Sequence, residues 1–89
     1  MPLVSVLIPV YNGAAYVRSA ITTALNQSDP DLEIIVSVDL CSDNSETIAK
    51  SFQDPRLKIF THTRRLGMTD NYKFLISQAK GEWITIIGQ

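Results

Sequence analysis

Short apolar runs alternate along the chain with longer stretches in which apolar residues recur every three or four positions. The runs cover residues 3–10, 32–39, 57–60 and 83–87. They are apolar on both faces, which is typical of strands buried between two layers of helices. Because helical stretches separate the runs, the order predicts an α/β fold of three layers, with a mostly parallel β-α-β-α-β-α-β sheet and right-handed crossovers.

Three stretches have the spacing of amphipathic helices. Their apolar positions are Val17, Ala20, Ile21, Ala24 and Leu25 in the first, Ile48, Ala49 and Phe52 in the second, and Met68, Tyr72, Leu75, Ile76 and Ala79 in the third. Asp43 and Glu46 form a capping-box pattern, which predicts the start of the second helix. Trp83 opens the last strand, and we expect its side chain in the core.

The composition indicates one small soluble domain, since 45% of the 89 residues are hydrophobic, 19% are charged and one is cysteine. This apolar fraction excludes a disordered chain, and the single cysteine excludes a disulfide scaffold. No apolar run approaches the ~18 residues of a membrane helix, and the start lacks the basic segment of a signal peptide. We therefore expect a cytoplasmic protein, or the cytoplasmic part of a larger one at the inner face of the membrane.

Charge is unevenly distributed, although the formal net charge is only −1. Residues 1–55 carry two basic and seven acidic side chains, whereas residues 56–89 carry six basic and two acidic ones. The near-neutral total argues against nucleic-acid binding, which needs a concentrated basic face. The asymmetry fits either charge complementarity within the fold or a local positive patch beside a phosphate ligand.

Polar and aromatic residues follow the first three strands. They are Pro9, Tyr11 and Asn12 after the first, residues 39–44 after the second, and His62, Arg64, Arg65 and Gly67 after the third. Ligands of open parallel sheets bind at the carboxyl ends of the strands, so these residues should share one edge. A ring to stack on a base, a carboxylate to accept its N–H and cations for a diphosphate suit a nucleotide. Dinucleotide, P-loop, zinc and Gly-x-Ser-x-Gly motifs are missing.

Each of these candidates also has a purely structural interpretation. Asp39 could cap a turn, and Asp43 fits an N-cap better than a direct ligand contact. Tyr11 could pack at the strand end, and Asn12 could form an Asx turn. The pattern alone leaves both interpretations open.

Several segments resemble family 2 glycosyltransferases, which have the GT-A fold. Residues 4–12 (VSVLIPVYN) resemble the opening strand of that family, and residues 32–45 (LEIIVSVDLCSDNS) resemble its second strand, whose usual run is VDDGSTDN. Gly67, Asn71 and residues 79–89 resemble the run that leads into the family's metal-binding acidic motif. The similarity covers essentially the whole chain and implies a Rossmann-like GT-A half-domain.

By position, the resemblance implies a nucleotide site. The residues at the matching positions are Pro9, Tyr11, Asn12, Asp39, Asp43, Gly67 and Asn71. The first three would shape the nucleoside pocket, and the last two would lie by the ribose or diphosphate. Asp39 would accept the imide N–H of uracil or thymine, while Asp43 would cap the second helix and line the pocket.

The sequence departs from the family pattern at four positions. Val38 replaces the first of two adjacent Asp residues, Leu40 replaces the following Gly, and Cys41 stands at the first hydroxyl position. Leu tolerates positive φ far worse than Gly, so the turn after the second strand is affected. Arg65 stands where many relatives carry Asn, and a phosphate contact there is a hypothesis of our own.

The implied enzyme transfers a sugar, with inversion, from a nucleoside diphosphate sugar to a glycan or lipid-linked acceptor, with UDP or dTDP favoured over GDP. In this family an acidic motif binds Mg²⁺ or Mn²⁺ and a later carboxylate acts as the base. Both motifs are expected after Gln89, so we expect no catalytic or metal-binding residue within residues 1–89.

Residues 1–89 are therefore expected to form the N-terminal sugar-nucleotide-binding part of a domain that is truncated before the metal motif. Alone, such a part should be inactive and either marginally stable or self-associating. The alternative function is a non-catalytic nucleotide-binding or interaction module of the same fold. A phosphoacceptor signalling domain is disfavoured, because no acidic cluster follows the first strand.

Overall fold

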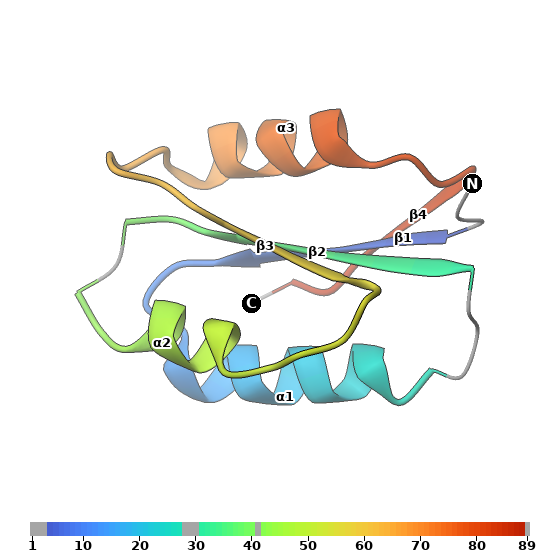
Figure 1. Cartoon of the computed structure of the whole chain (residues 1–89). Coiled ribbons are helices and arrows are strands. Elements are labelled where there is room, and N and C mark those ends of the chain that lie inside the picture. Colours follow the sequence, from blue (N-terminus) through green and yellow to red (C-terminus); the bar gives the residue numbers. More distant parts are fainter. Residues whose placement is uncertain (1–3, 28–30, 41, 89) are drawn as a thin grey trace.

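The computed structural model describes residues 4–27, 31–40 and 42–88, and Cys41 lies outside them. The strands are β1 (Val4–Val10), β2 (Leu32–Val38), β3 (Leu57–Thr61) and β4 (Trp83–Ile86), and the helices are α1 (Ala14–Leu25), α2 (Ser45–Lys50) and α3 (Met68–Gln78). The strands form one sheet in the order β3-β2-β1-β4, and every pair is parallel. The α/β order predicted from the sequence is confirmed (Figure 1).

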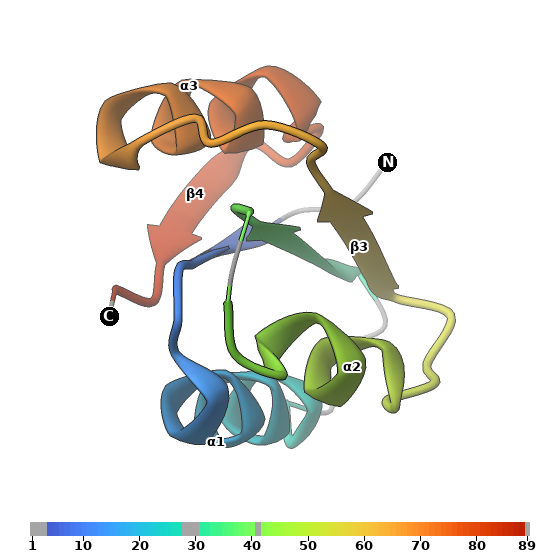
Figure 2. The ribbon, with the colours of Figure 1, turned by 90° about the vertical axis from the view of Figure 1, so that its left-hand side faces the viewer.

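The sheet lies between two helical layers. Helices α1 and α2 cover one face and α3 covers the other, as Figures 1 and 2 show from two directions. Because side chains alternate across a strand, neighbouring residues of β2 enter different cores. Ile34 and Val36 pack in the larger core beneath α1 and α2, whereas Ile35 packs with Leu7 and Leu75 beneath α3.

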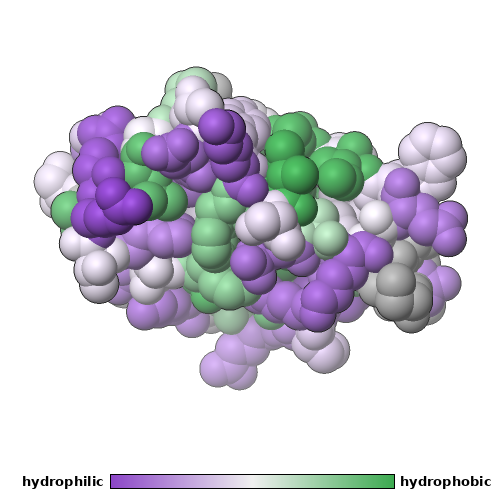
Figure 3. All heavy atoms as spheres, turned by 90° about the horizontal axis from the view of Figure 1, so that it is seen from above, coloured by the Kyte–Doolittle hydropathy of each residue, from purple (hydrophilic) through white to green (hydrophobic). Residues whose placement is uncertain are grey.

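The last strand is more exposed than its sequence predicts. Trp83 is 67% exposed and Ile84 and Ile86 are also exposed, so the expectation that Trp83 lies in the core is wrong. The reason is topological, since β4 is an edge strand that pairs only with β1 in the described part of the chain. Apolar patches interrupt the polar surface on the α3 side of the molecule (Figure 3).

A buried carboxylate fastens the chain where α3 leads into β4. Glu33 accepts hydrogen bonds from Ser5 Oγ at 2.5 Å, from the backbone N–H of Lys80 at 2.6 Å and from Lys58 Nζ at 3.3 Å. Burial alone would raise the pKa of Glu33, but these donors outweigh it and hold the pKa below its ordinary value. The N–H of Gly81 donates in turn to Ser5 Oγ at 2.8 Å, so the turn lies directly on β1.

Within the part of the chain that the structure describes, no helix has both the length and the apolar character needed to cross a bilayer.

The close approach of Gly81 to β1 leaves no room for a side chain. A Cβ at this position would lie 2.7 Å from the backbone nitrogen of Ser5 and 2.9 Å from the carbonyl carbon of Val4. Gly81→Ala is therefore expected to lower the free energy of unfolding by about 1–3 kcal/mol, measured by urea denaturation.

Gly88→Ala is the matched control, because its Cβ would meet only Tyr72 Oη, at the ordinary distance of 3.7 Å. We expect it to change the free energy of unfolding by less than about 1 kcal/mol. If the two substitutions changed the free energy of unfolding equally, the close contact between Gly81 and β1 would not stabilise the fold.

Candidate functional site

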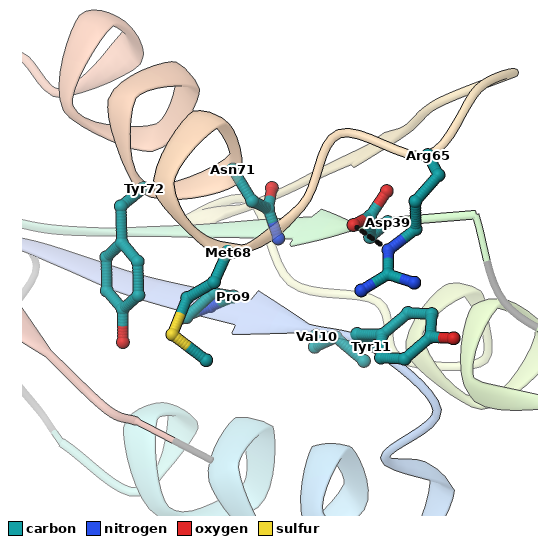
Figure 4. A pocket seen from close by; sticks show the side chains of 8 residues that line it. All are labelled: Pro9, Val10, Tyr11, Asp39, Arg65, Met68, Asn71 and Tyr72. Atoms are coloured by element: carbon teal, nitrogen blue, oxygen red, sulfur yellow. Dashed lines mark hydrogen bonds and ion pairs between the residues drawn. The ribbon is translucent and has the colours of Figure 1, made fainter.

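A cavity of about 260 Å³ opens at the carboxyl ends of β1 and β2, beneath the first turns of α3. Its lining residues are Pro9, Val10, Tyr11, Asp39, Arg65, Met68, Asn71 and Tyr72 (Figure 4). The strand order reverses at β1, whose neighbours are β2 on one side and β4 on the other. Open α/β sheets bind ligands in the crevice beyond the strand ends at such a point, so this cavity is the candidate site.

The carboxylate of Asp39 holds the loop between β3 and α3. Its Oδ1 accepts the backbone N–H groups of Leu40 and Leu66, each at 2.8 Å. Its Oδ2 accepts the N–H of Gly67 and the Nε–H of Arg65, each at 3.0 Å. Four donors thus converge on one carboxylate, which has about four acceptor positions. This side chain therefore fixes the loop to the end of β2.

Asp39 is almost completely buried, with 2% of its surface exposed. Burial by itself would raise the pKa of its carboxyl group, because the charged form loses solvation. The donors from Leu66, Leu40, Gly67 and Arg65 outweigh that effect and hold the pKa of Asp39 below its ordinary value. The group is therefore an ionised acceptor at neutral pH and not a proton donor.

Arg65 joins Asp39 to the aromatic ring at the end of β1. Its guanidinium carbon lies 3.6 Å from the centroid of the Tyr11 ring, in a cation–π contact. Figure 4 shows the guanidinium group between the Tyr11 ring and the Asp39 carboxylate. The Arg65 side chain remains 51% exposed, and Tyr11 is 38% exposed.

Asn71 reaches the cavity from the first turns of α3 and is held by β2. Its Nδ2 donates to the carbonyl oxygen of Ser37 at 3.2 Å, and its Oδ1 accepts from Ser37 Oγ at 2.5 Å. Ser37 Oγ also lies 2.8 Å from Nε2 of His62. The His62 ring packs edge-on against the Phe74 ring, with 4.7 Å between the ring centroids. Because the single hydroxyl proton goes to Asn71, the His62 ring donates through Nε2.

Gly67 supports the site without lining the cavity. Its φ of 82° lies in the left-handed region, which only glycine adopts without strain. This backbone turns its N–H toward Asp39 and its carbonyl oxygen toward the N–H of Asn71, at 3.0 Å. Gly67 is thereby the N-cap residue of α3 and sets where that helix begins.

Asn12 and Asp43, which were expected at the site, are not among the residues that line the cavity. Asn12 has a φ of 46°, and its Oδ1 accepts the backbone N–H of Ser42 at 2.9 Å. Asp43 accepts the N–H of Ala14 at 3.2 Å and that of Ser45 at 3.0 Å. These are the first residues of α1 and α2, so one carboxylate serves the starts of both helices.

The predicted capping box is wrong in its details. Helix α2 begins at Ser45 with Asn44 as its N-cap residue, and that residue makes no side-chain cap. Asp43 bonds Ser45 and not Glu46, because its carboxylate is shared with the start of α1.

In the described residues Asn12 is the only non-glycine residue with positive φ, so Leu40 avoids the strained geometry that its family position suggested.

Sequence reasoning missed three lining residues, Val10, Met68 and Tyr72. Val10 belongs to a run assigned to the core. The spacing of Met68 and Tyr72, four positions apart, marks one face of α3, and the residues sit where that helix face extends past the strand ends. The spacing of Met68 and Tyr72 can be read from the sequence. Which residues of this helix face line a cavity depends on where α3 begins.

The described residues contain no group of three His, Cys, Asp or Glu side chains that could hold a metal ion. A hard divalent cation needs several oxygen ligands, so this set does not fit one.

Residues 5–88 match the family model described as "Glycosyl transferase family 2". The chain is 57% identical to an uncharacterized glycosyltransferase of Rickettsia prowazekii (strain Madrid E), covering 94% of this chain and 26% of that protein. It is 36% identical to the GalNAc(5)-diNAcBac-PP-undecaprenol beta-1,3-glucosyltransferase of Campylobacter jejuni, covering 98% of this chain and 29% of that protein. The chain thus spans between a quarter and a third of the length of these relatives.

Solved structures of other proteins share the fold, and two of them illustrate the match. The mannosyltransferase PcManGT from Pyrobaculum calidifontis, in complex with GDP-Man and Mn²⁺, superposes with a TM-score of 0.84 at 25% identity, over 98% of this chain and 27% of that one. S. aureus TarS 1–349, in complex with UDP-GlcNAc, superposes with a TM-score of 0.86 at 22% identity, over 97% of this chain and 26% of that one. The expected Rossmann-like GT-A fold is confirmed.

The hydrogen bonds at Asp39 predict how the free energy of unfolding depends on pH. The lowered pKa means that this carboxylate stabilises the fold above the unfolded-state value of about 3.9, and that the contribution is lost as the pH falls through the folded-state pKa. Asp39→Asn should lower the free energy of unfolding at pH 7 by about 1.5–3 kcal/mol, because the amide cannot accept four donors. Urea denaturation at a series of pH values measures this.

The difference between Asp39→Asn and the unaltered protein should shrink as the pH falls below about 4. Asp70→Asn is the control, because Asp70 is exposed in the first turn of α3. This substitution should lower the free energy of unfolding by less than about 1 kcal/mol. A difference that stays constant down to pH 2 would show that the charge on Asp39 does not hold the loop.

Proposed function

The chain belongs to glycosyl transferase family 2, and from that membership we propose that it provides the donor-nucleotide site of a sugar-transferring enzyme. The donor is a nucleoside diphosphate sugar, and the acceptor is a glycan or a lipid-linked sugar. The observation that carries the proposal is the cavity at the strand ends, which combines an exposed aromatic ring, a buried carboxylate and an exposed guanidinium group. These three groups match a base and a diphosphate.

The relatives support both the proposed donor and the proposed acceptor. Three solved structures with this fold were determined with GDP-Man, UDP and UDP-GlcNAc, which are nucleotides or nucleotide sugars. The Campylobacter jejuni relative is named for transfer to an undecaprenol-linked glycan, which supports a lipid-linked acceptor. We assign an inverting reaction on the same family resemblance.

The base is proposed to be uracil or thymine, so that UDP or dTDP carries the sugar. The base stacks on Tyr11, and its imide N–H is accepted by the Asp39 carboxylate at the end of β2. Asn71 is held rigidly at the cavity wall by Ser37 and is placed to contact the ribose or diphosphate. Arg65 supplies a solvent-accessible positive charge for the phosphates, since half of its side chain is exposed.

In the complete enzyme, Mg²⁺ or Mn²⁺ would screen the charge of the leaving nucleoside diphosphate, and its ligands are expected beyond Gln89. The residues of this chain bind and orient the nucleotide. The catalytic base is likewise expected in the remaining part of the enzyme, and we assign no catalytic role to residues 1–89.

Stacking on Tyr11 can be tested by substitution. Tyr11→Ala should weaken UDP binding by about 5- to 150-fold, since stacking of a base on an aromatic side chain contributes about 1–3 kcal/mol. Isothermal titration calorimetry with UDP, dTDP and GDP measures the effect and identifies the preferred base.

Tyr11→Phe is the matched control, because it keeps the ring and removes only the hydroxyl group. It should bind UDP within about threefold of the unaltered protein, a difference of less than 1 kcal/mol. If Tyr11→Ala binds UDP as tightly as Tyr11→Phe, the base does not stack on this ring.

A further inference from the structure

Arg65 contacts both groups that the proposed function assigns to the base. Its guanidinium group lies 3.6 Å above the Tyr11 ring and donates to Asp39 Oδ2 at 3.0 Å. We infer that Arg65 fills the base position in the unliganded protein, and that it makes the site selective for nucleoside diphosphates over nucleosides. This inference rests on the proposed function and deepens it, because it explains how one residue links recognition of the base to recognition of the phosphates.

The acceptor capacity of Asp39 supports the exchange. Of the four donors described above, three are backbone N–H groups of Leu40, Leu66 and Gly67, which cannot leave without moving the backbone. A carboxylate has about four acceptor positions, and all four are used. Among these four donors, the Arg65 side chain is the one that a base N–H can replace without moving the backbone.

The stacking surface leads to the same conclusion. A separation of 3.6 Å is the contact distance of two planar groups, so no base fits between Arg65 and the ring. The ring face that Arg65 covers is the one turned toward Asp39 (Figure 4). The cavity of about 260 Å³ is also slightly below the usual range of about 300–1,000 Å³ for small-molecule sites. Removing the guanidinium group would add the covered face of the Tyr11 ring to this cavity, which Tyr11 already lines.

Arg65 is also the most solvent-accessible part of this arrangement. Its side chain is 51% exposed, whereas that of Asp39 is 1% exposed. The ion pair is open to solvent on its Arg65 side, and an exposed cation–π contact is weak. A ligand that gives the buried Asp39 carboxylate a replacement N–H donor can therefore displace the guanidinium group. A bound diphosphate offers the displaced group new charge-assisted hydrogen bonds, and a nucleoside offers none. Base binding is thus opposed by Arg65 unless phosphates accompany the base.

The test compares uridine and UDP as ligands of the unaltered protein, of Arg65→Ala and of Arg64→Ala, by isothermal titration calorimetry. Arg64→Ala removes the same charge from the adjacent exposed position and is the matched control. Arg65→Ala should bind uridine about three- to tenfold more tightly, because uridine then no longer has to displace a guanidinium group from Tyr11 and Asp39. The factor by which the diphosphate improves binding should fall by about tenfold in the same variant.

A second measurement needs no substitution. The side-chain Nε–H signal of Arg65 in a ¹H–¹⁵N NMR spectrum reports its bond to Asp39, and saturation with uridine should shift it strongly. If uridine binds and this signal stays in place, or if Arg65→Ala leaves uridine affinity equal to that of Arg64→Ala, the inference is overturned. If neither the unaltered protein nor either variant binds uridine or UDP, the proposed function fails, and the inference fails with it.

Discussion

The carboxylate of Asp39 is the group on which the candidate site depends. It brings together the end of β2, the loop after β3 and the start of α3, through three backbone N–H groups and one side chain. Its charge is stabilised by those donors, as the lowered pKa shows. Without these hydrogen bonds, the backbone N–H of Gly67 would lose its acceptor at the N-cap of α3, and the cavity wall would lose this support.

Two further carboxylates organise the molecule in the same way. Glu33 fixes the turn before β4 at one end of the sheet, and Asp43 serves the starts of α1 and α2 at the other. The acidic first half and the basic second half of the chain meet in two of these places, in the pairs Lys58–Glu33 and Arg65–Asp39. The charge asymmetry of the sequence is therefore used, at least in these pairs, as complementarity within the fold.

The order of elements could be predicted from the sequence, because buried parallel strands and amphipathic helices leave distinct local periods. The exposure of Trp83 could not, since an edge strand and a central strand have the same apolar run and differ only in strand order. Asp43 was identified as a helix-start residue, but its sharing between two helices depends on a contact across 29 residues. The bond between Arg65 and Asp39 spans 26 residues and likewise leaves no local signal.

The central claim is that a nucleotide base enters between Tyr11 and the Asp39 carboxylate while the loop after β3 stays in place. A crystal structure of the protein with UDP bound tests it most directly. The account predicts the uracil ring stacked on Tyr11, its imide N–H on Asp39, and the N–H groups of Leu66 and Gly67 still bonded to that carboxylate. Uracil bound elsewhere, with Arg65 still stacked on Tyr11, would contradict the account.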